Sequence, residues 1–280
     1  MYTCVRLLEE SDLQSADKVL TSAFGGPFSR LDDLRLYRQI QPDGWFVAEK
    51  EGRLVGMVGA ANYGNLAHVG LMAVQPECRR QGIGRALMEH LLARLGRQQV
   101  PLVTLDASKM GQPLYEQLGF VPYDETYTYQ RTVGFVLSPP QHTQITPEDL
   151  DELAQGDRII FGADRRKVFQ TLLQNFPDRA FVLRDDRGRL EGWIFAQKFR
   201  IGPWVILKPE KAELLLQVAL GLPFERIISL TVPSSNQPAI DLLHRYGFER
   251  VRTNRRMARG AEKDPCQREK IWSQTSLAMG

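Results

Sequence analysis

The chain has 280 residues, 43% hydrophobic and 25% charged, with a formal net charge of +3. This length suits two domains of about 100–200 residues, and so small a basic excess gives no reason to expect nucleic acid as a partner. Three widely spaced cysteines, Cys4, Cys78 and Cys266, predict neither a disulfide framework nor a structural zinc site. No apolar run approaches the about 20 residues of a membrane span, and early acidic residues argue against a signal peptide. We therefore expect a cytoplasmic protein with no membrane partner and no metal.

The first half predicts an alternation of helices and strands. After Gly82, apolar residues recur at helical spacing, which indicates a helix to about Leu95 with one buried face. The other predicted elements, in chain order, are a helix at 12–24, a hairpin at 45–60, strands at 68–74 and 102–105, a helix at 113–118 and a strand from residue 120.

Three segments of the first half have counterparts in the second half, in the same order. The matched pairs are 5–13 with 143–150, 46–56 with 181–192, and L-Y-E-Q-L-G-F (114–120) with L-L-H-R-Y-G-F (242–248). We interpret this internal repeat as two tandem copies of one α/β domain. The copies would span 1–135 and 144–260, joined by a Pro-Pro linker at 136–143, and the polar tail at 261–280 would be loosely ordered.

A candidate phosphate-binding loop lies between the strand at 68–74 and the following helix. Its core is Arg79-x-x-Gly82-x-Gly84, directly before the helix begins. The first amides of a helix have no internal partner and carry partial positive charge, and glycines let an anion approach the backbone. Arg79, Arg80 and Arg85 add positive charge. The spacing fits neither a Gly-Lys-Ser/Thr nucleotide loop nor the G-x-G-x-x-G of a dinucleotide fold.

The wider pattern V-x-P-x-x-R-x-x-G-x-G-x-x-L, from Val74 to Leu87, resembles the acetyl-CoA pyrophosphate loop of the GCN5-related N-acetyltransferases. The resemblance covers roughly residues 3–130. It implies two tandem domains of this family, each a mixed, mostly antiparallel sheet flanked by helices. It implies acetyl-CoA as the co-substrate, bound by Met72, Ala73, Val74, Arg79, Arg80, Gln81, Gly82, Ile83, Gly84 and Arg85.

The same resemblance suggests groups for catalysis. The main chain of Met72–Val74 would donate a hydrogen bond to the thioester oxygen, where negative charge develops. Tyr115 occupies the position of a tyrosine that family members use as the acid for the departing thiolate. His68 lies where relatives carry a basic carboxylate, and an ordinary histidine pKa of about 6.5 suits a base. Glu49, Asp106 or a relayed water are alternatives for this role.

The second half lacks the loop. No Arg-x-x-Gly-x-Gly follows its strand at 201–207, and Glu210 and Glu213 near the next helix start would repel a phosphate. This half resembles the C-terminal half of tandem bacterial acetyltransferases, which implies a structural or substrate-shaping role. Asp157, Asp164 and Arg165 are either contacts for the acceptor or a helix cap and solvated charges.

These features favour an enzyme, monomeric or homodimeric, that moves an acetyl group from acetyl-CoA to a primary amine of a small molecule. Two alternatives remain open at this stage. One is a non-catalytic acyl-CoA sensor, and the other is an acetyltransferase for protein lysines or N-termini.

Overall fold

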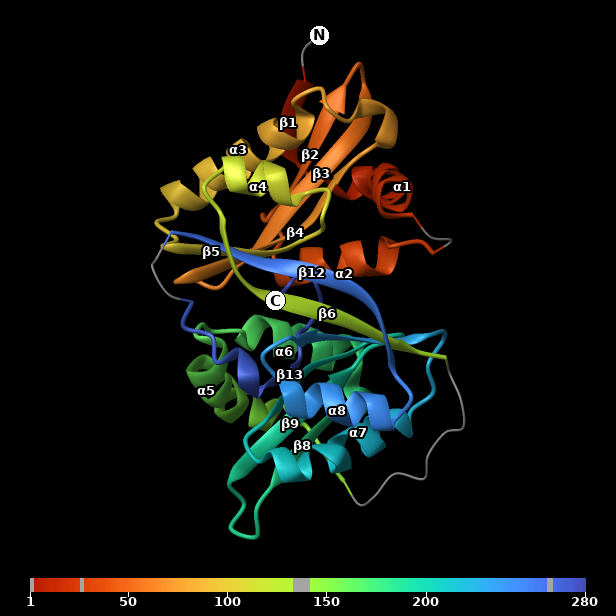
Figure 1. Cartoon of the computed structure of the whole chain (residues 1–280), viewed down its shortest axis with the longest axis vertical. Helices are drawn as coiled ribbons and strands as arrows, with labels where there is room; N and C mark the ends of the chain where they lie inside the picture. The colour runs from red at the N-terminus through yellow and green to blue at the C-terminus, as the bar shows by residue number, and fades with distance from the viewer. Residues whose placement is uncertain (1–2, 26–27, 133–141, 261–263) are drawn as a thin grey trace.

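The computed structural model describes residues 3–25, 28–132, 142–260 and 264–280. Two lobes of mixed α/β structure lie one above the other, and helices pack on a sheet in each (Figure 1). The predicted fold class is therefore confirmed. Most of the predicted linker at 136–143 lies outside the described residues.

The first half contains β1 (Thr3–Leu7), α1 (Leu13–Phe24), α2 (Leu31–Ile40), β2 (Trp45–Lys50), β3 (Arg53–Asn62), β4 (Leu66–Val74), α3 (Ile83–Arg97), β5 (Leu102–Ala107), α4 (Gln112–Gln117) and β6 (Val121–Arg131). The second half contains β7 (Thr143–Gln144), α5 (Leu150–Phe161), α6 (Arg166–Asn175), β8 (Ala180–Arg184), β9 (Leu190–Ala196), β10 (Ile201–Ile206), α7 (Ala212–Leu220), β11 (Ile228–Pro233), α8 (Gln237–Arg245), β12 (Glu249–Gly260) and β13 (Ile271–Ser273).

Every element predicted for the first half is present. The stripe predicted for α3 is buried at Ile83, Leu87, Met88, Leu91 and Leu95, and it packs against the strands in one apolar cluster. We did not predict α2, although its buried Leu34, Tyr37 and Ile40 recur at three-residue spacing. Its charged residues on the other face masked that stripe.

The strands of the two halves interleave. In the described part of the chain they form one sheet in the order β1-β2-β3-β4-β5-β12-β6-β11 and another in the order β13-β10-β9-β8-β7. β12 of the second half thus lies between β5 and β6 of the first, and β6 lies between β12 and β11 (Figure 1). The larger sheet is therefore built from both halves, since β12 pairs with β5 and β6, and β6 pairs with β11.

The two halves also share a core. One apolar cluster joins α1 and α2 to α5 and α6, with Leu20 and Leu34 on one side and Leu153 and Phe169 on the other. Lys167 of α6 extends this contact by donating hydrogen bonds to the first half. The tandem copies predicted from the repeat are therefore packed as one body.

The expectation of a loosely ordered tail is wrong for residues 264–280. β13 pairs with β10, and Ile271, Trp272 and Met279 are each at most 2% exposed. Ser273 and Gln274 of the tail are also buried, although their polar side chains are typical of surface positions. The Ser273 hydroxyl and the Gln274 Nε2 find hydrogen-bond partners inside the protein, which offsets part of the cost of burying these side chains, although Gln274 Oε1 has no partner among the described residues.

The exchange of strands predicts that the first half cannot fold alone. A fragment of residues 1–135 would lack β12, which pairs with β5 from Arg255 to Gly260 and with β6 from Glu249 to Ala258. Two unpaired strand edges would be exposed. We expect this fragment to show no cooperative thermal unfolding by circular dichroism, and to form a stable complex when co-expressed with residues 136–280. A sharp unfolding transition of the isolated fragment would contradict this.

Candidate active site

The sheet of the first half opens between β4 and β5. These strands pair in parallel only from Leu66 to Val69 on β4. Beyond this point β4 carries a bulge opposite β3, with Leu71 in the left-handed region at φ 51°. The main chain from Gly70 to Val74 is therefore not paired with β5. We call this divergence of the two strands the opening.

The loop between β4 and α3 has the shape of an anion nest. Arg80 (φ 62°) and Gly82 (φ 82°) are left-handed, which turns successive amides toward one point. Within the described part of the chain, no hydrogen bond takes up the amides of residues 80–85. Gly82 is exposed, and nothing lies within 4 Å of where its Cβ would be. The loop predicted to hold a phosphate thus presents unpaired donors to solvent.

The three predicted arginines of this loop do not act alike. Arg79 turns inward: its Nε donates to the Val74 carbonyl at 3.2 Å, and its Nη2 donates to the Ala23 carbonyl at 3.0 Å. It therefore ties the end of α1 to β4. Arg80 and Arg85 are exposed, and the latter lies 3.6 Å from Glu89. These two can supply mobile positive charge to an anion on the loop.

Tyr115 lies close to the start of α3. A Cβ on Gly84 would be 3.0 Å from Met72 Cε and 3.4 Å from Leu114 Cδ2, so the glycine lets β4, α3 and α4 meet. Tyr115 is 7% exposed and packs against Phe120. Burial raises the pKa of its phenol, which keeps it protonated. In the described part of the chain the Tyr115 hydroxyl has no hydrogen-bond partner, and it is not fully closed to solvent.

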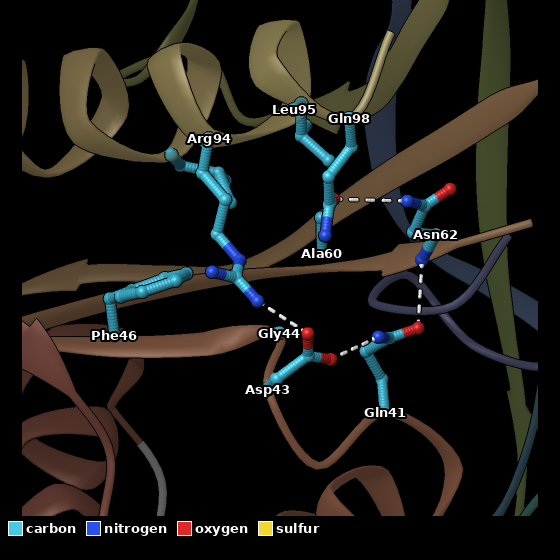
Figure 2. Close-up of a pocket in the computed structure, with 10 residues that line it drawn as sticks. Gln41, Asp43, Gly44, Phe46, Ala60, Asn62, Arg94, Leu95 and Gln98 are labelled. Atoms are coloured by element: carbon cyan, nitrogen blue, oxygen red, sulfur yellow. Dashed lines mark hydrogen bonds and ion pairs between the residues drawn. The ribbon is translucent and has the colours of Figure 1, made fainter. Parts of the chain in front are cut away.

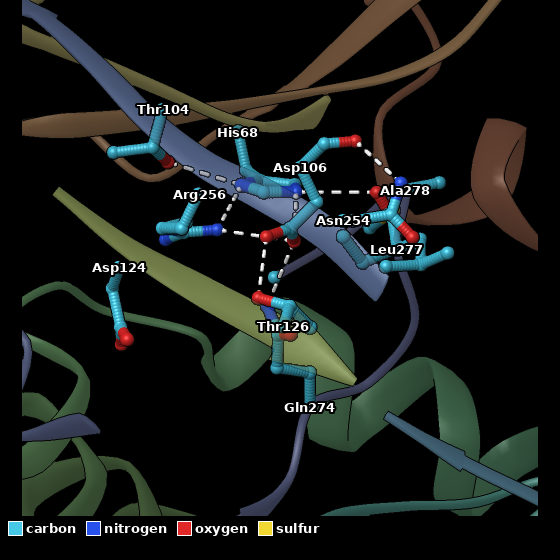
Figure 3. Close-up of polar contacts among 12 residues, drawn as sticks. His68, Thr104, Asp106, Asp124, Thr126, Asn254, Arg256, Gln274, Leu277 and Ala278 are labelled. Carbon is cyan, nitrogen blue, oxygen red and sulfur yellow. Dashed lines mark hydrogen bonds and ion pairs between the residues drawn. The ribbon is translucent and has the colours of Figure 1, made fainter. Parts of the chain in front are cut away.

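His68 lies on the other face of β4, in a buried polar network (Figure 3). Its Nδ1 is 3.0 Å from Thr104 Oγ1 and 3.0 Å from Arg256 Nη1. A guanidinium only donates, so Nδ1 must accept and Nε2 must carry the proton. Nε2 then donates to the Leu277 carbonyl at 3.3 Å. Burial and the charge of Arg256 lower the pKa of His68 to about 3.

Asp106 is the centre of this network. It accepts from Thr126 at 2.6 Å and from Gln274 at 3.2 Å, and Arg256 lies 3.4 Å away. Burial would raise the pKa of Asp106, but the charges of Arg256 and Arg268, the nearby His68 and the hydrogen bond from Thr126 together outweigh burial, and the pKa is lowered. The carboxylate is therefore ionised and already committed to partners. Asp106 and the neutral His68 are both closed to solvent, which disfavours either as a base in this conformation.

Glu49 does not reach the opening. It is on β2, with β3 between it and β4, and its carboxylate lies 3.2 Å from Arg6. The structure thus packs α4, the helix that carries Tyr115, against Gly84 at the start of α3. It leaves the three predicted bases, His68, Asp106 and Glu49, away from the loop. A base that acts through water stays as the remaining prediction.

The equivalent opening in the second half is filled. β10 and β11 meet only at a parallel bridge between Arg200 and Ser229, and β13 enters between them. Ser273 donates to the Ile201 carbonyl at 2.8 Å, and the Gln274 amide donates to the Thr231 carbonyl at 2.8 Å. A ligand could enter this opening only by displacing β13, a strand that we did not predict.

The charged residues singled out in the second half are structural in this conformation. Arg165 and Asp157 form a buried pair, 2.7 Å apart, and Asp164 accepts from the amide of Arg166 at the start of α6. Arg165 also donates to the Gly280 carbonyl at 3.3 Å. These contacts fit the predicted alternative of a helix cap and paired charges.

A small pocket lies at the opposite end of α3 from the loop (Figure 2). An ion pair between Arg94 and Asp43 forms one side, and Asn62 bonds to Gln98 at 3.1 Å on the other. Arg94 is ten residues beyond Gly84, or about 15 Å along the helix. This pocket is therefore separate from the candidate site.

Comparisons with known proteins agree with this arrangement. Family models described as "Acetyltransferase (GNAT) domain" match residues 18–136 and, separately, residues 153–273. The chain belongs to the GNAT acetyltransferase family. It is an acyltransferase with two GNAT domains in tandem, and GNAT acetyltransferases use acetyl-CoA. No helix in the described residues has the length and apolar character to cross a bilayer.

Relatives and solved structures extend the likeness over the whole chain. An uncharacterized N-acetyltransferase of Bacillus subtilis, YitH, is 24% identical over 71% of this chain and 72% of its own. A mycothiol acetyltransferase of Thermobispora bispora is 35% identical over 36% of this chain and 39% of its own. The crystal structure of a proposed acetyltransferase from Pyrococcus horikoshii, at 25% identity, covers 100% of this chain and 98% of its own with a TM-score of 0.86.

The low pKa of His68 predicts a loss of stability in acid. Between pH 6.5 and 3 the unfolded chain binds a proton on this side chain that the folded GNAT protein does not, so stability falls as the pH falls. From pH 7 to pH 5 this contributes about 2 kcal/mol. In urea unfolding at both pH values, His68→Asn should lose this part of the difference. The exposed His244→Asn should keep it, and equal pH dependence in the two variants would refute the assignment.

Proposed function

We propose that the first half of this GNAT protein binds acetyl-CoA at the loop between β4 and α3 and transfers its acetyl group to a primary amine of a small molecule. The observation that carries the proposal is the set of unpaired amides at residues 80–85. Donors at the start of a helix suit a diphosphate. The exposed side chains of Arg80 and Arg85 would neutralise negative charge on the diphosphate.

The opening between β4 and β5 gives the thioester a place beside free main chain. The prediction named Met72–Val74 as the source of the donor for the thioester oxygen. The bulge at Leu71 favours Met72, the first residue of that segment, as the donor. A bulge turns a strand amide away from its partner in the neighbouring strand. A fixed amide at this point would stabilise the negative charge that develops on the oxygen during attack.

The leaving group needs a proton. When the amine nitrogen bonds to the acetyl carbon, the carbon–sulfur bond breaks and a thiolate departs. Tyr115 is protonated, its hydroxyl is unpaired among the described residues, and its neighbour Leu114 packs at Gly84. We propose that Tyr115 gives its proton to the sulfur. The amine loses its proton to a base that acts through water, since the predicted side-chain bases are either buried or remote from the opening.

A small acceptor is favoured because the second half covers the face of the first on which His68 lies. Several relatives carry the name mycothiol acetyltransferase, and the mycothiol in that name is a small molecule. The enzyme names of these relatives also favour catalysis over the alternative of an acyl-CoA sensor. Acetylation of protein lysines or N-termini stays a second candidate without an observation of its own.

Substitution of Gly82 tests the cofactor site. Gly82→Val puts a β-branched side chain at φ 82° on the exposed nest, and we expect the affinity for acetyl-CoA, measured by calorimetry, to fall at least tenfold. Gly188→Val is the matched control, because Gly188 has φ 77°, also has nothing within 4 Å, and lies in the turn between β8 and β9. It should lose similar stability without losing affinity. Unchanged binding by a folded Gly82→Val would refute the loop assignment.

Substitution of Tyr115 tests the acid. Tyr115→Phe keeps the packing against Phe120 and removes only the hydroxyl, so the affinity for acetyl-CoA should hold. Turnover with an amine acceptor should fall by about 10²-fold, the lower range for general acid catalysis. The alkaline side of the pH–rate profile should also change, because an acid of raised pKa is lost. If turnover is unchanged at every pH, Tyr115 is not the acid.

A further inference from the structure

The last residues of the chain lie on the candidate active site. We name residues 275–280 the terminal loop. A Cβ on Gly70 of β4 would be only 2.4 Å from Ala278 Cα and 2.6 Å from the Ala278 carbonyl oxygen. Gly70 directly precedes the bulged Leu71. The terminal loop therefore touches β4 two residues before Met72, where the main chain proposed to bind the thioester oxygen begins.

The terminal loop and the cofactor loop lie on opposite faces of the sheet. Val69 and Leu105 point to the α3 face, where they share a cluster with Ile83 and Leu87. His68 and the terminal loop are on the other face: the His68 Nε2 contacts the Leu277 carbonyl (Figure 3). An amine that reaches the opening without crossing the bound diphosphate must come from this second face. The terminal loop fills that approach.

Few polar contacts hold the terminal loop to the first half. The Tyr63 hydroxyl donates to the Met279 carbonyl at 2.7 Å, and the Tyr37 hydroxyl bonds to Ser276 Oγ at 2.9 Å. From the second half, Arg165 donates to the carbonyl of Gly280 and to the hydroxyl of Thr275. These are mostly side-chain contacts, whereas β13 just before the loop is paired through its backbone with β10.

The terminal loop also closes on itself. The Thr275 amide donates to the Gly280 carbonyl at 2.9 Å, and the Gly280 amide donates to the Ser276 carbonyl at 3.1 Å. These bonds are internal to the terminal loop, so they do not tie it to either half. When the loop leaves the site, with β13 as its fixed base, their amides become open to exchange with solvent. His68 also contacts the Leu277 carbonyl, and Gln197 donates to the Thr275 carbonyl at 3.3 Å. Loss of these side-chain contacts is the main polar cost of that movement.

We propose that the terminal loop is an autoinhibitory plug of the acceptor approach, and that it must swing away from Gly70 before an amine can attack. The proposal rests on the function proposed for this opening. Among the contacts of the described residues, the terminal loop makes none with residues 79–85, so acetyl-CoA binds with the plug in place. The alternative is a fixed wall that never moves during turnover.

Removal of the plug is the direct test. A stop codon after Gln274 retains β13 and deletes the terminal loop. We expect the release of coenzyme A from acetyl-CoA, with hydroxylamine as the probe nucleophile and the protein-free rate subtracted, to rise at least tenfold over the full chain. The affinity for acetyl-CoA should be unchanged. Unchanged affinity with an unchanged rate would overturn the plug and favour the fixed wall.

A single substitution in the full chain gives a second test that does not depend on the truncated chain folding. Tyr63→Phe removes one hydrogen bond to Met279, and loss of a buried bond shifts the balance toward the open loop by about fivefold. Release of coenzyme A should rise by the same factor, and hydrogen exchange at the Met279 and Gly280 amides should accelerate. Tyr246→Phe is the control, because its hydroxyl bonds to Glu213 and Gln217 far from the loop.

The outcomes separate this proposal from the proposed function. A full chain with no affinity for acetyl-CoA in calorimetry would remove the proposed function and the plug together. A full chain that binds acetyl-CoA, with Tyr63→Phe matching Tyr246→Phe in both release rate and hydrogen exchange, would overturn the plug alone.

Discussion

The insertion of β12 between β5 and β6 is the constraint on which the rest of the structure depends. A strand in the middle of a sheet must be paired on both edges, so the sheet that contains β5 and β6 is incomplete until β12 of the second half joins it. The same strand carries Arg256 to His68 and Asp106. The chain that follows β12 lies between the two lobes, where β13 and the terminal loop are buried.

The candidate cofactor loop could be predicted because its physics is local. Gly82 and Gly84, the start of a helix and nearby arginines define an anion nest within a few residues, whatever the partners of the strand before it. Tyr115 was predictable only through the family resemblance. Its short helix reaches the loop because Gly84 allows close approach, and no spacing in the sequence reveals that contact.

The exchanged strand and the buried tail could not be predicted, because both depend on partners distant in sequence. The repeat indicated two domains, but a repeat cannot show which copy of a strand pairs with which sheet. β12 carries exposed arginines such as Arg252 and Arg255 beside the buried Arg256, which hides its central place. Likewise, Ser273 and Gln274 look like surface residues until the carbonyls and carboxylates they meet are known. The inward turn of Arg79 is a third example, since only the fold brings the Ala23 carbonyl within its reach.

The two halves began from one pattern and use the same opening in different ways. In the first half the opening between β4 and β5 keeps free main chain on the α3 side, and the loop there presents unpaired amides. In the second half β13 takes the corresponding backbone donors and acceptors, so a ligand would have to displace a strand. Because β13 and the terminal loop are continuous, the segment that closes the second site also anchors the residues that cover the first.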